Sequence, residues 1–176
     1  NTWVGAQVKI FHQQDKVPQP NSMGSIFPII APSRVNVRQG EWNPIRILSD
    51  WPRLQVWING EQVQDLNVDL IPELKYRLRR GYLGLSALGY PLRFRNLQIR
   101  ELPDSEKWEP LYESDADMEK WFISESNPKA PAVFDSINGV MRVDGSGHLA
   151  TKERYRYFQL HLYARGPQHH NGGILF

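Results

Sequence analysis

The chain contains no cysteine, and this absence excludes several kinds of chemistry at once. Disulfide frameworks, thiol nucleophiles and cysteine-ligated zinc sites all need a residue type that the 176-residue sequence does not have. No apolar run approaches the roughly 18 residues of a membrane-spanning helix, so we expect no membrane span. The sequence also has no Ser-His-Asp signature, phosphate-binding loop or glycine-rich nucleotide motif.

A net excess of one charge is also missing, since 21 Lys and Arg residues stand against 19 Asp and Glu residues. The acids are unevenly placed, with eight of them and one base between Glu101 and Glu119. The bases are scattered along the sequence rather than gathered in a stripe, and the one tight basic run, residues 75–80, is typical of a solvated strand edge or loop. We therefore do not expect nucleic acid as a partner.

What the sequence does have is aromatic side chains and a period of two. Six Trp, seven Tyr and seven Phe residues are far more than a disordered segment carries. Apolar and polar residues alternate in many short runs, which is the pattern of strands with one face on a core. The predicted strands are Val4–Phe11, Trp42–Leu48, Leu54–Ile58, Leu92–Ile99, Val140–Val143 and Phe158–Arg165.

Turn residues separate these runs and complete the prediction of the fold class. Asn59-Gly60 and Asn138-Gly139 fit two-residue hairpin turns, because both central positions of such turns need positive φ. The one predicted helix is short, at Ser114–Lys120. We therefore predict an all-β protein, a two-sheet antiparallel jelly-roll sandwich. The residues predicted to be buried between the sheets are Ala6, Val8, Ile10, Val56, Ile58, Leu160 and Leu162.

Four motifs in the first part of the chain carry a resemblance to a known family. They are GEWNPIRI (40–47), VWINGEQV (56–63), GLSALG (84–89) and FRNLQIREL (94–102). In this order they resemble the C-terminal half of the 3-keto-disaccharide hydrolase domains. The resemblance implies a concanavalin A-like lectin or glucanase fold with one concave sheet, and an activity on glycosides that are oxidised at C3 of the sugar.

The second part of the chain resembles the N-terminal half of the same family, so the order is permuted. Its motifs include YFQLHL (157–162) and HNGGILF (170–176), and the strand that follows them in the family resembles GAQVKI (5–10). We expect residues 1–176 to form one sandwich domain, with 1–102 and 121–176 as the exchanged halves and 103–120 as an acidic linker. The alternative is one period cut from a tandem-repeat protein. The pattern also predicts that the strand at 4–11 lies beside the strand ending at Phe176.

The candidate site follows from alternation together with the resemblance. Sugar sites need aromatic platforms and planar polar groups, and the polar positions of the strands at 3–11 and 157–165 supply such groups. We predict that both strands contribute to one concave face. The candidate catalytic residues are His161 and His170, because histidine is a general acid or base near neutral pH. The candidate sugar-binding residues are Gln7, Lys9, Trp57, Gln159, Tyr163, Arg165 and Asn171.

Departures from the family pattern bear on catalysis. The family strand usually carries Glu where Gln7 stands, and a neutral amide can only form hydrogen bonds. The remaining acids Asp135, Asp144 and Glu153 have the setting of turn residues. No metal site is predicted, although a divalent metal is the one cofactor that the resemblance leaves open.

Three functions remain open at this point. The chain is an enzyme acting on 3-keto-glycosides, a non-catalytic carbohydrate-binding module, or a protein-interaction module. The expected partner is a carbohydrate, the expected assembly is a monomer or a swapped dimer, and the expected location is secreted or periplasmic.

Overall fold

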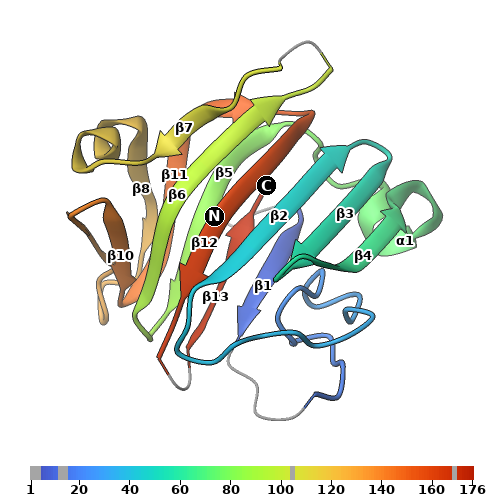
Figure 1. Ribbon diagram of the computed structural model, residues 1–176, viewed down its shortest axis with the longest axis horizontal. Helices are drawn as coiled ribbons and strands as arrows, with labels where there is room; N and C mark the ends of the chain where they lie inside the picture. Colours follow the sequence, from blue (N-terminus) through green and yellow to red (C-terminus); the bar gives the residue numbers. More distant parts are fainter. Residues whose placement is uncertain (1–4, 12–15, 104–105, 168–169) are drawn as a thin grey trace.

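The computed structural model describes residues 5–11, 16–103, 106–167 and 170–176, and in these residues the chain folds as two stacked antiparallel β-sheets (Figure 1). The five-stranded sheet has the order β1-β13-β5-β11-β8, and the eight-stranded sheet has the order β4-β3-β2-β12-β6-β10-β9, with β7 paired to β6. The all-β sandwich prediction is confirmed, and the arrangement is consistent with a jelly roll.

Each of the six strands predicted with bounds has a counterpart among the strands of the two sheets. The five-stranded sheet consists of β1 (Gln7–Phe11), β5 (Gly81–Leu88), β8 (Trp121–Ser126), β11 (Ser146–Tyr155) and β13 (Asn171–Leu175). The eight-stranded sheet consists of β2 (Asn43–Asp50), β3 (Arg53–Ile58), β4 (Glu61–Asn67), β6 (Leu92–Glu101), β7 (Glu109–Tyr112), β9 (Val133–Ile137), β10 (Val140–Asp144) and β12 (Phe158–Arg165).

Helices are short in the described part of the chain. They are η1 (Val68–Leu70), α1 (Pro72–Lys75) and η2 (Asp115–Lys120), and η2 is the helix predicted from the sequence. Ser114 caps η2 through a capping box with Asp117, which explains why this polar segment turns helical without an apolar stripe.

The core lies between the two sheets, as the alternation predicts. All seven residues predicted to be buried there are at most 7% exposed. Both predicted hairpins are also confirmed, because Asn59 and Gly60, and likewise Asn138 and Gly139, have positive φ. Positive φ at both positions matches the right-handed twist of the flanking strands.

The two ends of the described chain meet in the five-stranded sheet. Strand β1 pairs antiparallel with β13, and the backbone of Ala6 exchanges two hydrogen bonds with Phe176. The predicted pairing of these strands is therefore confirmed. Whether the order of the halves arose by circular permutation stays a prediction.

The segment 103–120, expected as a linker, contributes directly to the sandwich. Strand β7 pairs with β6, and Leu111 and Tyr112 are buried in the core. The short run was missed as a strand because it contains Pro110, which is tolerated here because β7 has no further strand beside it.

Candidate functional site on the eight-stranded sheet

The two strands predicted to share one face lie in opposite sheets. Strand β1 belongs to the five-stranded sheet, and β12 lies in the middle of the eight-stranded sheet. Val8 and Leu160 both point into the core between the sheets, so the polar residues of the two strands point to opposite outer surfaces. The prediction of one shared face is wrong, because alternation tells which residues face the core but not which sheet a strand joins.

The polar residues of β1 are engaged in local packing. Lys9 is only 3% exposed, its ammonium lies 4.1 Å from the centre of the Phe27 ring, and burial lowers its pKa. Gln7 donates a long hydrogen bond of 3.5 Å to the carbonyl of Gly172 in β13. Their part in sugar binding stays a prediction.

His170 and Asn171 lie where β13 begins in the five-stranded sheet, whereas His161 lies in the eight-stranded sheet. His170 is 3% exposed, and its Nδ1 lies 2.7 Å from the carbonyl oxygen of Pro167. This contact ties the ring to Pro167, two residues after β12 ends. Asn171 is half-buried and stands opposite Phe11 in the β1–β13 register. The structure therefore brings neither residue to the face that carries His161.

The predicted residues of β12 do share one face. Gln159, His161, Tyr163 and Arg165 alternate with buried residues and point outward from the eight-stranded sheet. The register places His161 opposite Arg46 of β2, and Arg46 in turn stands opposite Trp57 of β3. A row of three side chains from three adjacent strands therefore crosses this face.

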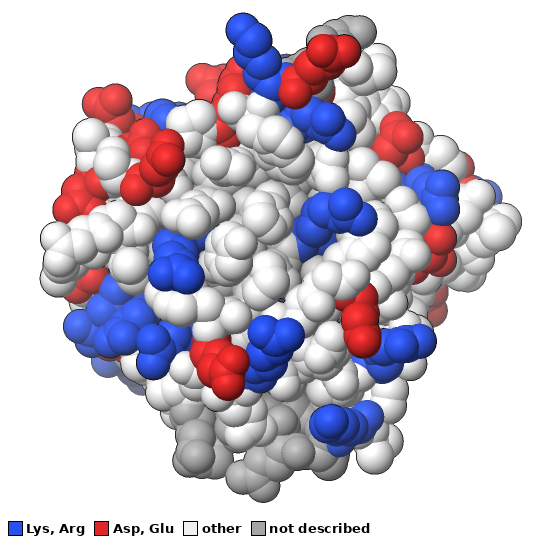
Figure 2. Space-filling view, viewed as in Figure 1, with Lys and Arg blue, Asp and Glu red and all other residues white. Residues whose placement is uncertain are grey.

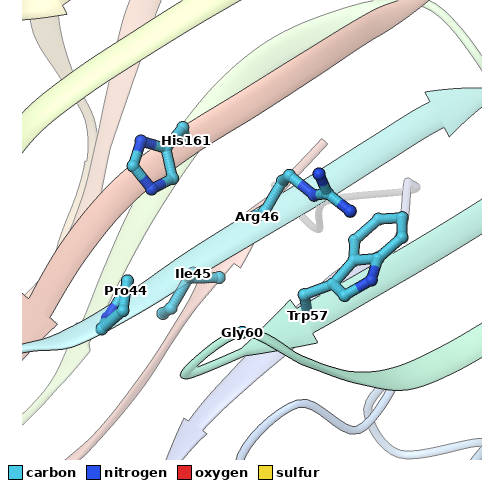
Figure 3. Close-up of a pocket in the computed structure, with 6 residues that line it drawn as sticks. All are labelled: Pro44, Ile45, Arg46, Trp57, Gly60 and His161. Atoms are coloured by element: carbon cyan, nitrogen blue, oxygen red, sulfur yellow. The ribbon is translucent and has the colours of Figure 1, made fainter.

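This row lines a shallow pocket of about 290 Å³ (Figure 3). Its six lining residues are Pro44, Ile45, Arg46, Trp57, Gly60 and His161. The Arg46 guanidinium stacks on the Trp57 ring at 3.7 Å, and Figure 3 shows Arg46 on β2, with His161 on the neighbouring strand to one side and Trp57 to the other. The pocket thus offers an aromatic surface, a cation and an imidazole side by side.

The surroundings of His161 favour its neutral form. Burial lowers the pKa of its imidazole, and the positive charge of Arg46 lowers it further. The ring also packs edge-on against Tyr163, with centres 5.4 Å apart. A neutral imidazole in this position is able to accept a proton from a bound molecule near pH 7.

Further aromatic and arginine side chains, which the sequence analysis did not select, extend the face. The Trp108 ring lies 6.4 Å from His161 and 5.4 Å from the guanidinium of Arg100. Arg100 also donates a hydrogen bond of 2.7 Å to Gln159. The signal was weak in the sequence, since Arg100 directly follows the predicted strand Leu92–Ile99 and belongs to β6 only in the structure, and alternation does not rank one outward residue above another.

A second stack lies beside Tyr163. The Arg95 guanidinium centre is 4.3 Å from the Trp42 ring and 5.5 Å from the Tyr163 ring, and its buried Nε has no hydrogen-bond partner in the described residues. Buried Asn43 fixes the loop that carries Trp42, because its amide donates to the carbonyls of Arg38 and Glu41. These hydrogen bonds hold the loop in place next to the start of β2.

The carboxylates that we assigned to turns lie in strands instead. Asp135 is inside β9, Asp144 ends β10 and Glu153 is inside β11. Acids in strands were unexpected because they are depleted there. The six residues that line the pocket include no acid, and in the described residues no three His, Asp or Glu side chains converge as metal ligands would.

The comparison with known proteins covers part of the chain that carries this pocket. The model of the 3-keto-alpha-glucoside-1,2-lyase-like domain matches residues 1–100, which include Arg46 and Trp57. The chain belongs to this family. The match confirms the resemblance seen in the sequence and supports a carbohydrate-related function at the level of the family.

Two further findings leave this assignment unchanged. No curated protein sequence matches the chain. Within its described residues, no helix is long and apolar enough to cross a membrane.

Proposed function

We propose that this 3-keto-alpha-glucoside-1,2-lyase-like domain binds a glycoside in the pocket of the eight-stranded sheet and cleaves glycosides that carry a 3-keto group. The observation that carries the proposal is the row of Trp57, Arg46 and His161 across three adjacent strands. A sugar ring stacks on the exposed part of the indole, and its hydroxyl groups accept hydrogen bonds from the guanidinium.

The chemistry follows from the acidity that a 3-keto group gives to the neighbouring C2–H bond. Neutral His161 removes this proton, and the electron pair of the C–H bond passes into an enolate. Arg46 stabilises the negative charge on the enolate oxygen. The enolate then collapses: the C3 carbonyl re-forms, a C1–C2 double bond forms and the C1–O bond breaks with its electron pair on the glycosidic oxygen. This oxygen takes up the proton that His161 removed from C2, which restores the neutral imidazole.

This chemistry needs a single base and no carboxylate pair, in contrast to ordinary glycoside hydrolysis. The absence of acids among the six pocket residues is therefore compatible with turnover. The same composition also favours the second candidate, a carbohydrate-binding module without catalysis. The neutral Gln7 at the usual family Glu position favours that second candidate too.

The test uses a 3-keto-glucoside and three variants. We expect His161→Ala to reduce kcat by about 10²–10⁴, which is the usual contribution of a general base. Trp57→Ala should weaken binding of the glycoside. His148→Gln, on the five-stranded sheet, is the matched control and should leave both unchanged.

Each remaining outcome decides between the candidates. Binding that depends on Trp57 without any turnover identifies a binding module. Loss of turnover in Lys9→Ala and His170→Ala, with His161→Ala fully active, would move the site to the five-stranded sheet and overturn the proposal.

A further inference from the structure

Three arginines stand directly beside one another at one end of the eight-stranded sheet. In the register, Arg165 of β12 lies opposite Arg93 of β6, and Arg93 lies opposite Arg142 of β10. Their chain neighbours point into the core, so all three guanidinium groups lie on the outer face, where they are exposed. Figure 2 shows basic side chains gathered at the lower left, over the ends of β6 and β10.

Like charges directly opposite each other on neighbouring strands destabilise a sheet. Arg142 has a counter-charge, because it pairs with Asp144 at 2.8 Å. The guanidinium groups of Arg93 and Arg165 form no hydrogen bond or ion pair with any residue that the structure describes. Arg93 and Arg165 therefore form an unfavourable pair of like charges, and the N–H donors of their guanidinium groups are free for a ligand.

The same two arginines border a separate hollow of about 170 Å³. Its other lining residues are Gly40, Pro91, Gly166 and Pro167. This volume equals several water molecules, which is room for a carboxylate or a sulfate group. Two arginines that converge on one small hollow are the usual arrangement for binding an oxyanion.

The hollow lies on the same face as the candidate sugar site, farther along β12. Arg165 and His161 are four residues apart on the same face, which corresponds to about 13 Å along a strand. Between them lie Tyr163 and the stacked Arg95, whose buried Nε has no hydrogen-bond partner in the part of the chain described. A short saccharide chain laid along β12 therefore spans both places.

We propose that Arg93 and Arg165 form an anion subsite, so that this domain prefers acidic glycans that carry a carboxylate or a sulfate. The inference rests on the proposed sugar-binding function of the same face, and it adds the substrate class. Single-stranded nucleic acid also uses arginine and aromatic side chains on a sheet face. We favour an acidic glycan because the chain belongs to a family that acts on glycosides.

The test is calorimetric titration with four probes. They are a neutral oligosaccharide, a uronic-acid oligosaccharide of the same length, its sulfated counterpart and a single-stranded oligonucleotide. We expect the acidic saccharides to bind at least about tenfold more tightly than the neutral one, which corresponds to about 1.4 kcal/mol. The stronger of the two acidic probes tells a carboxylate site from a sulfate site.

Arg93→Gln and Arg165→Gln should each remove most of this preference and leave binding of the neutral saccharide unchanged. The matched control is Arg53→Gln, because Arg53 is exposed on the same sheet but is already paired with Asp65 at 3.0 Å. In the absence of ligand, Arg93→Gln should also raise the melting temperature at low salt, since it relieves the repulsion.

The outcomes separate the inference from the proposed function. Equal affinity for the neutral and acidic saccharides, or a preference that survives both substitutions, overturns the inference alone. Failure of all saccharides to bind overturns the proposed function as well. Tighter binding of the oligonucleotide than of any saccharide overturns both and assigns the face to nucleic acid.

Discussion

Replacing Gly5 by alanine tests whether the pairing of the two chain ends holds the sandwich together. A Cβ atom at Gly5 would lie 1.9 Å from the carbonyl oxygen and 2.5 Å from the carbonyl carbon of Phe176. Both are backbone atoms, so no side-chain rotation relieves the clash. The β1–β13 pair must therefore separate at this end.

The size of the effect follows from the contacts that this separation breaks. The hydrogen bonds from Ala6 N–H to the Phe176 oxygen (2.6 Å) and from Phe176 N–H to the Ala6 oxygen (3.0 Å) contribute about 1–3 kcal/mol together. The Phe176 ring, 5.6 Å from that of Phe158, also loses part of a burial worth about 1.5–3 kcal/mol. We expect a loss of about 2–4 kcal/mol in the free energy of unfolding.

Urea denaturation followed by far-UV circular dichroism measures this loss, with the slope m unchanged. The melting temperature should fall by roughly 4–16 °C, at about 2–4 °C per kcal/mol for a domain of this size. The control is Gly81→Ala, because a Cβ at Gly81 meets nothing within 4 Å. The free energy of unfolding of this control should lie within about 0.5 kcal/mol of the wild-type value. If Gly5→Ala also lies within this range, the pairing of the two ends does not hold the fold together.

Three further predictions concern stability. Burial lowers the pKa of His148 and His161, so below about pH 6.5 the unfolded chain binds protons that the folded chain does not bind. The urea midpoint of unfolding should therefore fall between pH 7.5 and pH 5. Turnover that depends on neutral His161 should persist below pH 6.5. A flat profile of midpoints would contradict this. Burial acts to raise the pKa of Asp117, but hydrogen bonds from Lys120 and from backbone amides outweigh this effect and lower the pKa to about 2. The stability that ionised Asp117 gives above about pH 3.8 is therefore lost as the pH falls toward 2. Because solvent screens this group, Asp117→Asn should cost only about 1 kcal/mol at pH 7, measured by thermal unfolding, and no cost would refute the capping role. Gln64→Leu should lower the free energy of unfolding by about 2 kcal/mol in urea denaturation, because the buried Gln64 amide donates hydrogen bonds to the loop carbonyls of Gly24 and Ala31. An unchanged free energy would mean that water takes the place of the amide at these carbonyls.

The sequence by itself determined the fold class, the positions of six strands and, in those strands, which side chains point to the core. Alternation with a period of two is enough to say that Leu160 is buried and His161 is not, because successive side chains of a strand point to opposite faces. The Asn-Gly turns are equally local, since their backbone geometry selects the residues that fit it. Strand β7 escaped prediction because it is short and contains a proline.

Apart from the two hairpins and the β1–β13 pair, only the tertiary structure decided which strands share a sheet. Most strand pairing joins residues distant in sequence, and no local pattern records it, so Lys9 and His161 were assigned to one face although they lie in opposite sheets. The same reason explains the arginines. Arg93, Arg142 and Arg165 are scattered along the chain, but strand register places them side by side. The character of the outer face is set by lateral neighbours across the sheet, and these exist only once the strands have paired.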